Sequence, residues 1–159
     1  MRTHGVVVVF LYHDHQWLLM KRAPDREHYP NVWDGVGGGI QAHEYTEPDR
    51  ALLRELYEET GIPEQHVFEL KLKYLHINVQ QEDLSLHYVY FARTDQTDVR
   101  QTEEGVLSWI PADAFLQREF SPAMAALLRH YVSEGQHTAD QYLFSTCNGV
   151  HTITPFETE

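Results

Sequence analysis

Three glutamates, Glu55, Glu58 and Glu59, recur at helical spacing within a short stretch of this chain. At 3.6 residues per turn, positions i, i+3 and i+4 share one side of a helix, within roughly 100° of arc. Carboxylates this close repel one another unless a cation neutralises them, and hard oxygen ligands suit Mg²⁺ or Mn²⁺. The spacing predicts a metal-binding helix face, and an exposed acidic face without a ligand is the alternative.

The residues around these glutamates predict the helix that would carry them. Pro48 suits a first turn, Thr46 is placed to cap it, and Gly61 can adopt the left-handed conformation that ends a helix. Such a helix would be amphipathic, with its carboxylates outward and an apolar side against a sheet. The residues expected on that apolar side are Leu53, Leu56 and Tyr57.

Two neighbouring features could help the carboxylates to bind a ligand. Arg54 lies four residues before Glu58, so its guanidinium can hold and orient a carboxylate by paired hydrogen bonds, whereas a surface ion pair is the alternative. Upstream, the consecutive glycines 37–39 permit a close approach of the backbone to a ligand or metal. The helix and the glycine turn are therefore expected to form one site.

The same residues resemble a known motif, because Gly38-x5-Glu44 followed by Arg54-Glu55-Leu56-x-Glu58-Glu59-x-Gly61-Ile62 is similar to the Nudix box of Nudix hydrolases. The family's usual pattern has seven residues between the first glutamate and the arginine, whereas residues 45–53 make nine here. We expect a turn two residues longer ahead of the helix, which leaves the helical spacing of the carboxylates unchanged.

The resemblance implies divalent metal ions, Mg²⁺ or Mn²⁺, bound between the glycine turn and the helix. The implied ligands are the Gly37 carbonyl and the side chains of Glu55, Glu58 and Glu59. One of these glutamates, with Glu58 preferred, would instead accept the proton of the attacking water, and Arg54 would orient the carboxylates.

A further metal ligand on a later loop is implied as well, because many relatives carry a glutamate there. Glu103, six residues before Trp109, is the candidate, and Glu104 follows it directly. An exposed acidic loop without a ligand is the alternative.

The segment Trp33-Asp34-Gly35-Val36-Gly37-Gly38 resembles the border of the base pocket in the oxidised-purine nucleoside triphosphatase branch of the family. Trp33, Asp34 and Gly38 are accordingly implied in substrate binding. Asp34 stands where a member of that branch has an asparagine, and a carboxylate cannot donate a hydrogen bond unless it is protonated. Aromatic residues that could stack on a base, with core packing as the alternative, are Phe10, Tyr90 and Phe120.

Composition fits a single domain over residues 1–159, since this length and 42% apolar content suffice for one core. A net charge of −12, from 24 acidic and 12 basic residues, argues against long nucleic acids and membrane surfaces as partners. The apolar run at 6–11 is too short to span a membrane, so a cytoplasmic protein is expected. The single cysteine, Cys147, cannot form an internal disulfide.

Apolar patterning places the remaining elements, and the resemblance implies the Nudix α/β/α sandwich with a mixed β-sheet. Strands are predicted at 6–11, 17–22, 70–77, 84–91 and 106–110. A second helix is predicted from Pro122 to near Gly135. Its stripe of Met124, Leu127, Leu128 and Tyr131 is expected to pack in the core.

The pair Asn148-Gly149 predicts a type I′ hairpin between 141–146 and 150–154, within a possible C-terminal extension at 137–159. This hairpin could extend the sheet, cover a pocket or pair with another subunit. A homodimer, the state of most relatives, is therefore a further expectation.

These features favour a metal-dependent hydrolase of a pyrophosphate bond in a nucleoside diphosphate derivative. The preferred substrate is a nucleoside triphosphate, normal or oxidised, cut to nucleoside monophosphate and pyrophosphate. One alternative is a hydrolase of nucleotide sugars or dinucleoside polyphosphates. Another is a Nudix-like module that senses a nucleotide without hydrolysing it.

Overall fold

A nine-stranded mixed β-sheet organises the chain. In the computed structural model, which describes residues 1–156, the strand order is β3-β2-β1-β6-β5-β8-β9, with β4 paired to β1 and β7 paired to β2. The strands are β1 Arg2–His13, β2 Gln16–Arg22, β3 Trp33–Asp34, β4 Val36–Gly39, β5 Val67–Gln80, β6 Asp83–Thr94, β7 Gly105–Pro111, β8 Tyr142–Cys147 and β9 Val150–Pro155.

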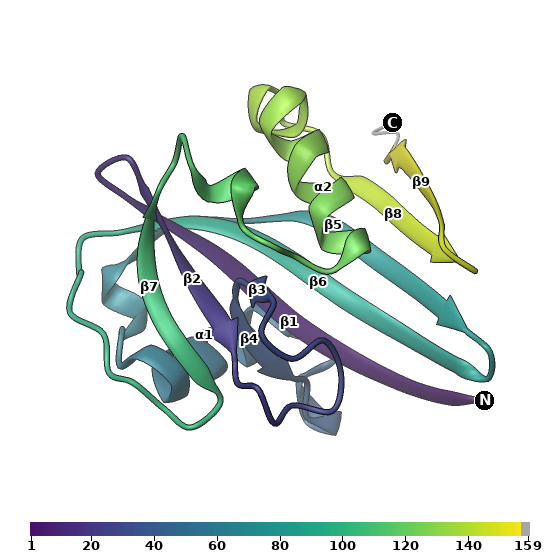
Figure 1. The fold of residues 1–159 in the computed structure, drawn as a ribbon, viewed down its shortest axis with the longest axis horizontal. Helices are drawn as coiled ribbons and strands as arrows, with labels where there is room; N and C mark the ends of the chain where they lie inside the picture. The colour runs from purple at the N-terminus through teal and green to yellow at the C-terminus, as the bar shows by residue number, and fades with distance from the viewer. Residues whose placement is uncertain (157–159) are drawn as a thin grey trace.

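Two helices, α1 (Pro48–Thr60) and α2 (Pro122–Ser133), cover opposite faces of this sheet (Figure 1). Successive side chains of a strand point to opposite faces, so β1 supplies both cores. Val8 and Phe10 join the core under α2, whereas Val9 joins the core under α1. This confirms the α/β/α sandwich with a mixed sheet.

The helix α1 carries the predicted carboxylates, but two details of its prediction were wrong. It begins after Glu47, so Thr46 is not its cap, and the side chain of Glu47 makes no capping hydrogen bond. The side chain of Tyr57 is 53% exposed, because the face turned to the sheet is centred on Leu52 and Leu56. Gly61 ends the helix in the left-handed conformation, as predicted.

The helix α2 was predicted closely. Ser121 caps it by accepting a hydrogen bond from the backbone N–H of Met124 at 3.4 Å, and Leu127 and Leu128 are fully buried. Tyr131 stacks on Phe91 of the sheet. Over residues 1–156, no helix combines the length and apolar character needed to cross a membrane.

The predicted C-terminal hairpin is present as β8 and β9, with Asn148 and Gly149 both at positive φ in the turn. Parallel pairing of β8 with β5, with Asn78 opposite Thr146, adds the hairpin to the sheet. Of the uses left open by the sequence, the structure therefore shows extension of the sheet. The end of the predicted extension, residues 157–159, lies outside the described residues.

Candidate active site

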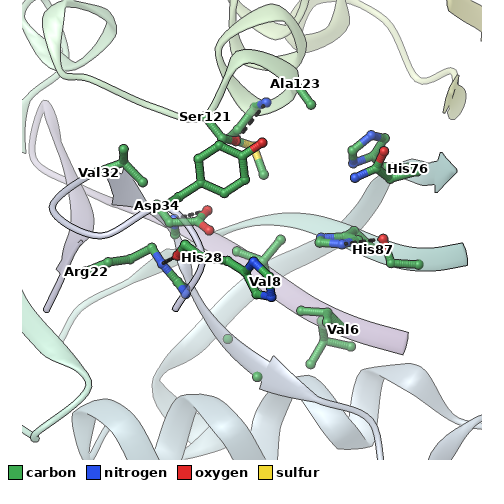
Figure 2. Close-up of a pocket in the computed structure, with 18 of the residues that line it drawn as sticks. Val6, Val8, Arg22, His28, Val32, Asp34, His76, His87, Ser121 and Ala123 are labelled. Carbon is green, nitrogen blue, oxygen red and sulfur yellow. Dashed lines mark hydrogen bonds between the residues drawn. The ribbon is translucent and has the colours of Figure 1, made fainter. Parts of the chain in front are cut away.

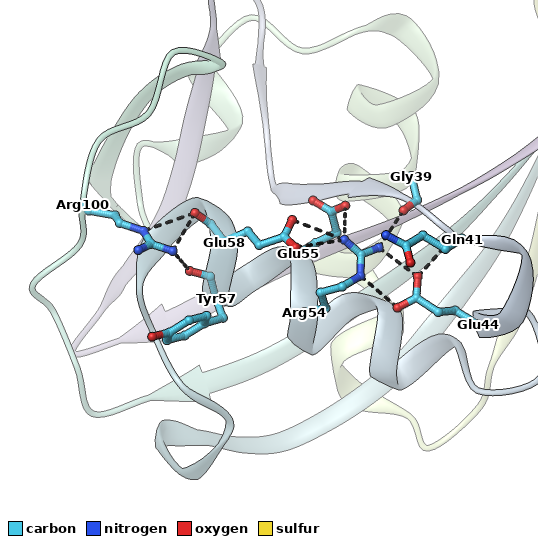
Figure 3. Close-up of polar contacts among 8 residues, drawn as sticks. All are labelled: Gly39, Gln41, Glu44, Arg54, Glu55, Tyr57, Glu58 and Arg100. Atoms are coloured by element: carbon cyan, nitrogen blue, oxygen red, sulfur yellow. Dashed lines mark hydrogen bonds and ion pairs between the residues drawn. The ribbon is translucent and has the colours of Figure 1, made fainter.

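The guanidinium of Arg54 is the centre of the polar network on α1 (Figure 3). It donates to both carboxylate oxygens of Glu44 at 2.8 and 2.9 Å and to Glu55 Oε1 at 2.9 Å. It also lies 3.2 Å from Glu58 Oε2 and donates to the carbonyl of Gly39 at 3.0 Å. The Arg54 side chain thus contacts three carboxylates and also bonds the glycine strand β4.

Glu44 shows how the longer turn is accommodated. Its side chain is 6% exposed in a 3₁₀ turn at Ala42–Glu44, where it also accepts the Gln41 N–H at 2.9 Å. The paired hydrogen bonds from Arg54 lower the pKa of Glu44 to about 2. Residues 45–47 connect this turn to α1, and Glu44 reaches Arg54 across this connection.

Gly37 and Gly38 of β4 are required by close packing on either side. A Cβ at Gly37 would lie 1.8 Å from the carbonyl oxygen of Val7, and one at Gly38 would lie 2.3 Å from Glu55 Oε2. Any larger residue at Gly38 would displace the Glu55 carboxylate. Gly37, Gly38 and Glu55 all line one cavity.

The third carboxylate of the helix, Glu59, is held by the loop that precedes β7. Thr102 Oγ1 donates to Glu59 Oε2 at 2.9 Å. Burial and the neighbouring Glu104 carboxylate raise the pKa of Glu59. Both Glu103 and Glu104 are exposed, but only Glu104 lines the cavity. The structure therefore places Glu104, the neighbour of the first candidate, beside the helix carboxylates.

Arg100 joins the same loop to the end of α1 (Figure 3). Its guanidinium donates to the carbonyl of Glu58 at 2.8 and 3.2 Å and to the carbonyl of Tyr57. Its backbone N–H donates to the carbonyl of Thr60 at 3.0 Å. Sequence reasoning did not single out Arg100, although α1 has no basic residue in its own last turn to bond these carbonyls.

The carboxylates fit a hard divalent cation by their chemistry. Burial raises the pKa of Glu55, with smaller contributions from Glu58 and Glu104, so a cation would relieve mutual repulsion in this cluster. Within the described chain no three acidic, histidine or cysteine side chains already converge as a ligand set. Binding would require rotation of carboxylates that Arg54 now holds.

A cavity of about 570 Å³ opens beside β4 (Figure 2). Trp33 and Asp34 line it, and the ring of Trp33 lies under the Arg118 guanidinium at 5.7 Å. The N–H of Gly35 donates to Asp34 Oδ1 at 2.7 Å. Burial nevertheless raises the pKa of Asp34 to about 6, and Arg22 only partly opposes this shift.

Three aromatic candidates for base stacking do not reach this cavity. Phe10 is 0% exposed and stacks on Phe91 at 5.4 Å between ring centroids. Phe120 is buried in the same core, next to Trp33. Tyr90 lies on the opposite face and donates to Asp49 Oδ1 at 2.6 Å. Core packing, the alternative for each, is what the structure shows.

Comparison with known proteins adds independent information. Residues 1–131 match the family model of the NUDIX domain. The nucleoside triphosphatase NudI of Shigella flexneri is 39% identical over 61 residues, which are 38% of this chain and 42% of that protein. NudI of Escherichia coli (strain 55989 / EAEC) shares the same figures. The alignment thus spans less than half the length of these curated relatives.

Solved structures agree in fold. The MutT protein of Bacillus halodurans superposes with a TM-score of 0.76 at 19% identity, covering 94% of this chain and 97% of that chain. The Nudix hydrolase RenU of M. smegmatis gives a TM-score of 0.68 at 20% identity, covering 84% and 88%. At these identities the likeness establishes the architecture alone.

Proposed function

This chain belongs to the NUDIX domain family, and we propose that it is a divalent-metal-dependent hydrolase of a pyrophosphate bond in a nucleoside diphosphate derivative. The proposed substrate is a nucleoside triphosphate, normal or oxidised, cut to nucleoside monophosphate and pyrophosphate. The name of the relative NudI, a nucleoside triphosphatase, supports this choice over nucleotide sugars and dinucleoside polyphosphates.

The observation that carries the proposal is the position of Arg54. One guanidinium bonds Glu44, Glu55 and the Gly39 carbonyl and lies 3.2 Å from Glu58. An ordinary exposed acidic face would not be tied to a glycine strand in this way, because surface ion pairs are usually loose and contribute little. The arrangement supports a functional cluster of carboxylates, gathered by one arginine at the edge of a cavity.

The metal would be held by the helix carboxylates Glu55, Glu58 and Glu59, with Glu104 and the Gly37 carbonyl beside them. When bound there, a divalent ion supplies Lewis-acid polarisation of the phosphoryl group and lowers the pKa of bound water.

The chain's own residues have separate roles. Glu58, whose side chain is 53% exposed, has the freedom to turn from Arg54 and accept a proton from water. The Glu44–Arg54 pair keeps Glu55 oriented, and Thr102 keeps Glu59 oriented.

The cavity beside β4 is the proposed place of the nucleoside. Trp33 offers an aromatic ring and Asp34 a hydrogen-bonding carboxyl, while Arg22 and Arg26 line the same cavity and can offset phosphate charge. The volume of about 570 Å³ lies within the usual range for sites of small organic ligands.

The test is release of pyrophosphate, phosphate and nucleotide from normal and oxidised nucleoside triphosphates, nucleotide sugars and dinucleoside polyphosphates, with Mg²⁺ or Mn²⁺. Glu58→Gln should abolish turnover, and Glu69→Gln, at an exposed glutamate of β5, should leave it unchanged. Metal-dependent turnover lost only in Glu58→Gln supports the hydrolase. Tight binding of a nucleotide without turnover in the unaltered protein would instead identify a nucleotide-sensing module.

A further inference from the structure

The cavity continues past the glycine strand to a polar wall built by β5 and β6. This wall, which we call the histidine wall, consists of His76, Asn78, Ser85 and His87, all of which line the cavity. Figure 2 shows His76 and His87 displaced from Asp34 toward the strands β5 and β6. The wall has no part in the catalytic roles assigned above.

The histidine wall is polar but its imidazoles carry no charge near neutral pH. Burial, together with neighbouring imidazoles, lowers the pKa of His76 to about 3 and that of His87 to about 4. The two rings lie 5.3 Å apart, and His87 Nε2 is 3.2 Å from Ser85 Oγ. A neutral imidazole can both donate and accept hydrogen bonds, which suits an uncharged ligand better than a phosphate.

One acceptor on this wall has no partner. Oδ1 of Asn78 is buried and makes no hydrogen bond within residues 1–156. Buried acceptors are almost always paired, because an unpaired one loses its hydration without compensation. A ligand that donates an N–H or O–H group into this end of the cavity would remove that cost.

The surroundings of the wall favour a flat ligand. Val6 and Val8 of β1 and Met124 of α2 line the same cavity and supply apolar surfaces. A nucleobase combines two apolar faces with a rim of donors and acceptors, so it can meet the apolar residues with its faces and the wall with its rim. A sugar presents hydroxyls on all sides and would leave them against the valines.

The C-terminal hairpin contacts His76 through the side chain of Thr146. Oγ1 of Thr146, on β8, lies 3.0 Å from His76 Nε2 and 2.9 Å from Nδ1 of His151, on β9. Thr146 is buried, and its residue position follows from the parallel pairing of β8 with β5. Both strands lie beyond residues 1–131, which match the family domain.

Because the Thr146 hydroxyl has a single proton, the direction of its hydrogen bonds is linked to the tautomer of His76. If Thr146 donates to His151, it must accept from His76 Nε2–H, and Nδ1 of His76 is then an acceptor. If Thr146 donates to His76 Nε2, then Nδ1 carries the proton and is a donor. Nδ1 makes no hydrogen bond within the described residues, so it is available to a ligand.

We propose that the histidine wall is a nucleobase subsite, and that Thr146 of the C-terminal hairpin is a positioning residue that fixes the tautomer His76 presents to the base. The proposal rests on the proposed nucleotide-hydrolase function and names the part of the substrate bound at this end. It gives Thr146, which lies outside residues 1–131 of the family domain, a part in base selection.

The first experiment compares Thr146→Val with Thr154→Val, the same substitution at an exposed residue of the same hairpin. Steady-state rates are measured with the four ribonucleoside triphosphates and with inorganic tripolyphosphate, which has no base. Thr146→Val should change the ranking of bases by about three- to ten-fold, the worth of one hydrogen bond, through KM and not kcat. Turnover of tripolyphosphate, if present, and all rates of Thr154→Val should remain unchanged.

Imidazole ¹⁵N NMR measures the tautomer of His76 directly, which a purely structural role of Thr146 would leave unchanged. The His76 nitrogen shifts should report one dominant tautomer in the unaltered protein and a different or mixed state in Thr146→Val. Thr146→Ser retains the hydroxyl and should retain both the tautomer and the base ranking. An unchanged base ranking together with an unchanged tautomer in Thr146→Val would overturn the role of Thr146.

Free nucleosides separate this proposal from the hydrolase proposal. If adenosine or guanosine moves the His76 and His87 signals while no triphosphate is hydrolysed, the subsite stands and the hydrolase function fails. If triphosphates are hydrolysed but no nucleoside moves these signals, the subsite fails and the hydrolase stands. If ribose shifted the His76 and His87 signals and free bases did not, the nucleobase assignment would also be overturned.

Discussion

Gly38 decides where the Glu55 carboxylate can lie. Because a Cβ at this position would meet Glu55 Oε2 at 2.3 Å, Gly38→Ala should push the carboxylate out of place. Displacement of a catalytic group by about 1 Å typically costs about 100-fold in rate, so we expect a fall of that order in kcat/KM.

Gly39→Ala is the matched control, since a Cβ there has no atom within 4 Å. Its rate and melting temperature should stay close to those of the unaltered protein. Equal activity of Gly38→Ala and Gly39→Ala would show that the position of Glu55 does not matter to the reaction.

Asp34 should make stability depend on pH in an unusual direction for a carboxyl group. Its pKa is raised from 3.8 to about 6 by burial, so the folded chain holds this proton to a higher pH than the unfolded chain. The stabilising contribution is complete below 3.8 and is lost as the pH rises through about 6. Asp34→Asn, which stays neutral, should therefore gain stability relative to the unaltered protein as the pH rises.

The measurement is the melting temperature of both proteins between about pH 4 and about pH 7.5, where their difference should grow by a few degrees. Asp113→Asn, at an exposed aspartate, serves as the control and should show no such trend. A constant difference between Asp34→Asn and the unaltered protein would mean that Asp34 titrates alike in folded and unfolded chains.

At the scale of elements, Arg100 couples the helix α1 to the loop before β7. Arg100→Met keeps most of the stem but removes the hydrogen bonds to the carbonyls of Tyr57 and Glu58. We expect a loss of about 1–2 kcal/mol of stability, because the last carbonyls of α1 lose their donors. A fall in kcat should accompany it, since the same loop presents Thr102 to Glu59.

Urea unfolding and steady-state kinetics measure these two effects. Arg93→Met is the comparison, because Arg93 is also exposed but has only a 4.0 Å contact with Glu69. If Arg100→Met and Arg93→Met behaved alike, the loop would not depend on this contact for its position.

The helix α1 shows which features a sequence can reveal. The shared face of the glutamates follows from the helical repeat alone and needs no tertiary information. The start of the helix was missed because Thr46 has a capping side chain, yet the longer turn moves the first residue to Pro48. The capping propensity of Thr46 did not set the start of the helix, and the turn before it instead brings Glu44 to Arg54.

The loop before β7 shows the limit of such reasoning. Which of two adjacent glutamates faces the site depends on the path of the backbone. That path is set by the Arg100 contacts and by Gln101, which bonds the backbone of Leu107. A single sequence carries no signal for this choice between Glu103 and Glu104.

The hairpin and the histidine wall show the same contrast between features set by local sequence and features set by tertiary pairing. Asn148-Gly149 specifies the turn locally, and it was predicted correctly. Its pairing partner is β5, about 70 residues away in the chain, and only that register brings Thr146 to His76. Histidines scattered through the sequence therefore gave no pattern that could be detected beforehand.

At the scale of the whole molecule, excess negative charge should make stability respond to divalent cations. The chain has 24 acidic and 12 basic residues, and three of the carboxylates meet at Arg54 of α1. A cation that binds only the folded cluster stabilises it by about 1.4 kcal/mol at ten times its Kd, which corresponds to about 4 °C in melting temperature.

Mg²⁺ should therefore raise the melting temperature more than NaCl of equal ionic strength, and EDTA should reverse the effect. Glu58→Gln should lose most of the increment, whereas Glu69→Gln should keep it. An identical response to Mg²⁺ in both variants would place the cation elsewhere on the acidic surface.

The central strand β1 acquires its neighbours at very different times during synthesis. On one edge it pairs with β2 and β4, which are complete by Gly39, and on the other it pairs in parallel with β6, which begins at Asp83. Ribosomes add roughly 5–20 residues per second, so this second edge stays open for several seconds while α1 and β5 are made.

During that interval the nascent chain exposes the apolar run Val6–Leu11 along an unpaired strand edge. Chaperones that bind extended apolar peptides would find their target there, and the helix α1 would gain its lasting support only once β6 has left the ribosome.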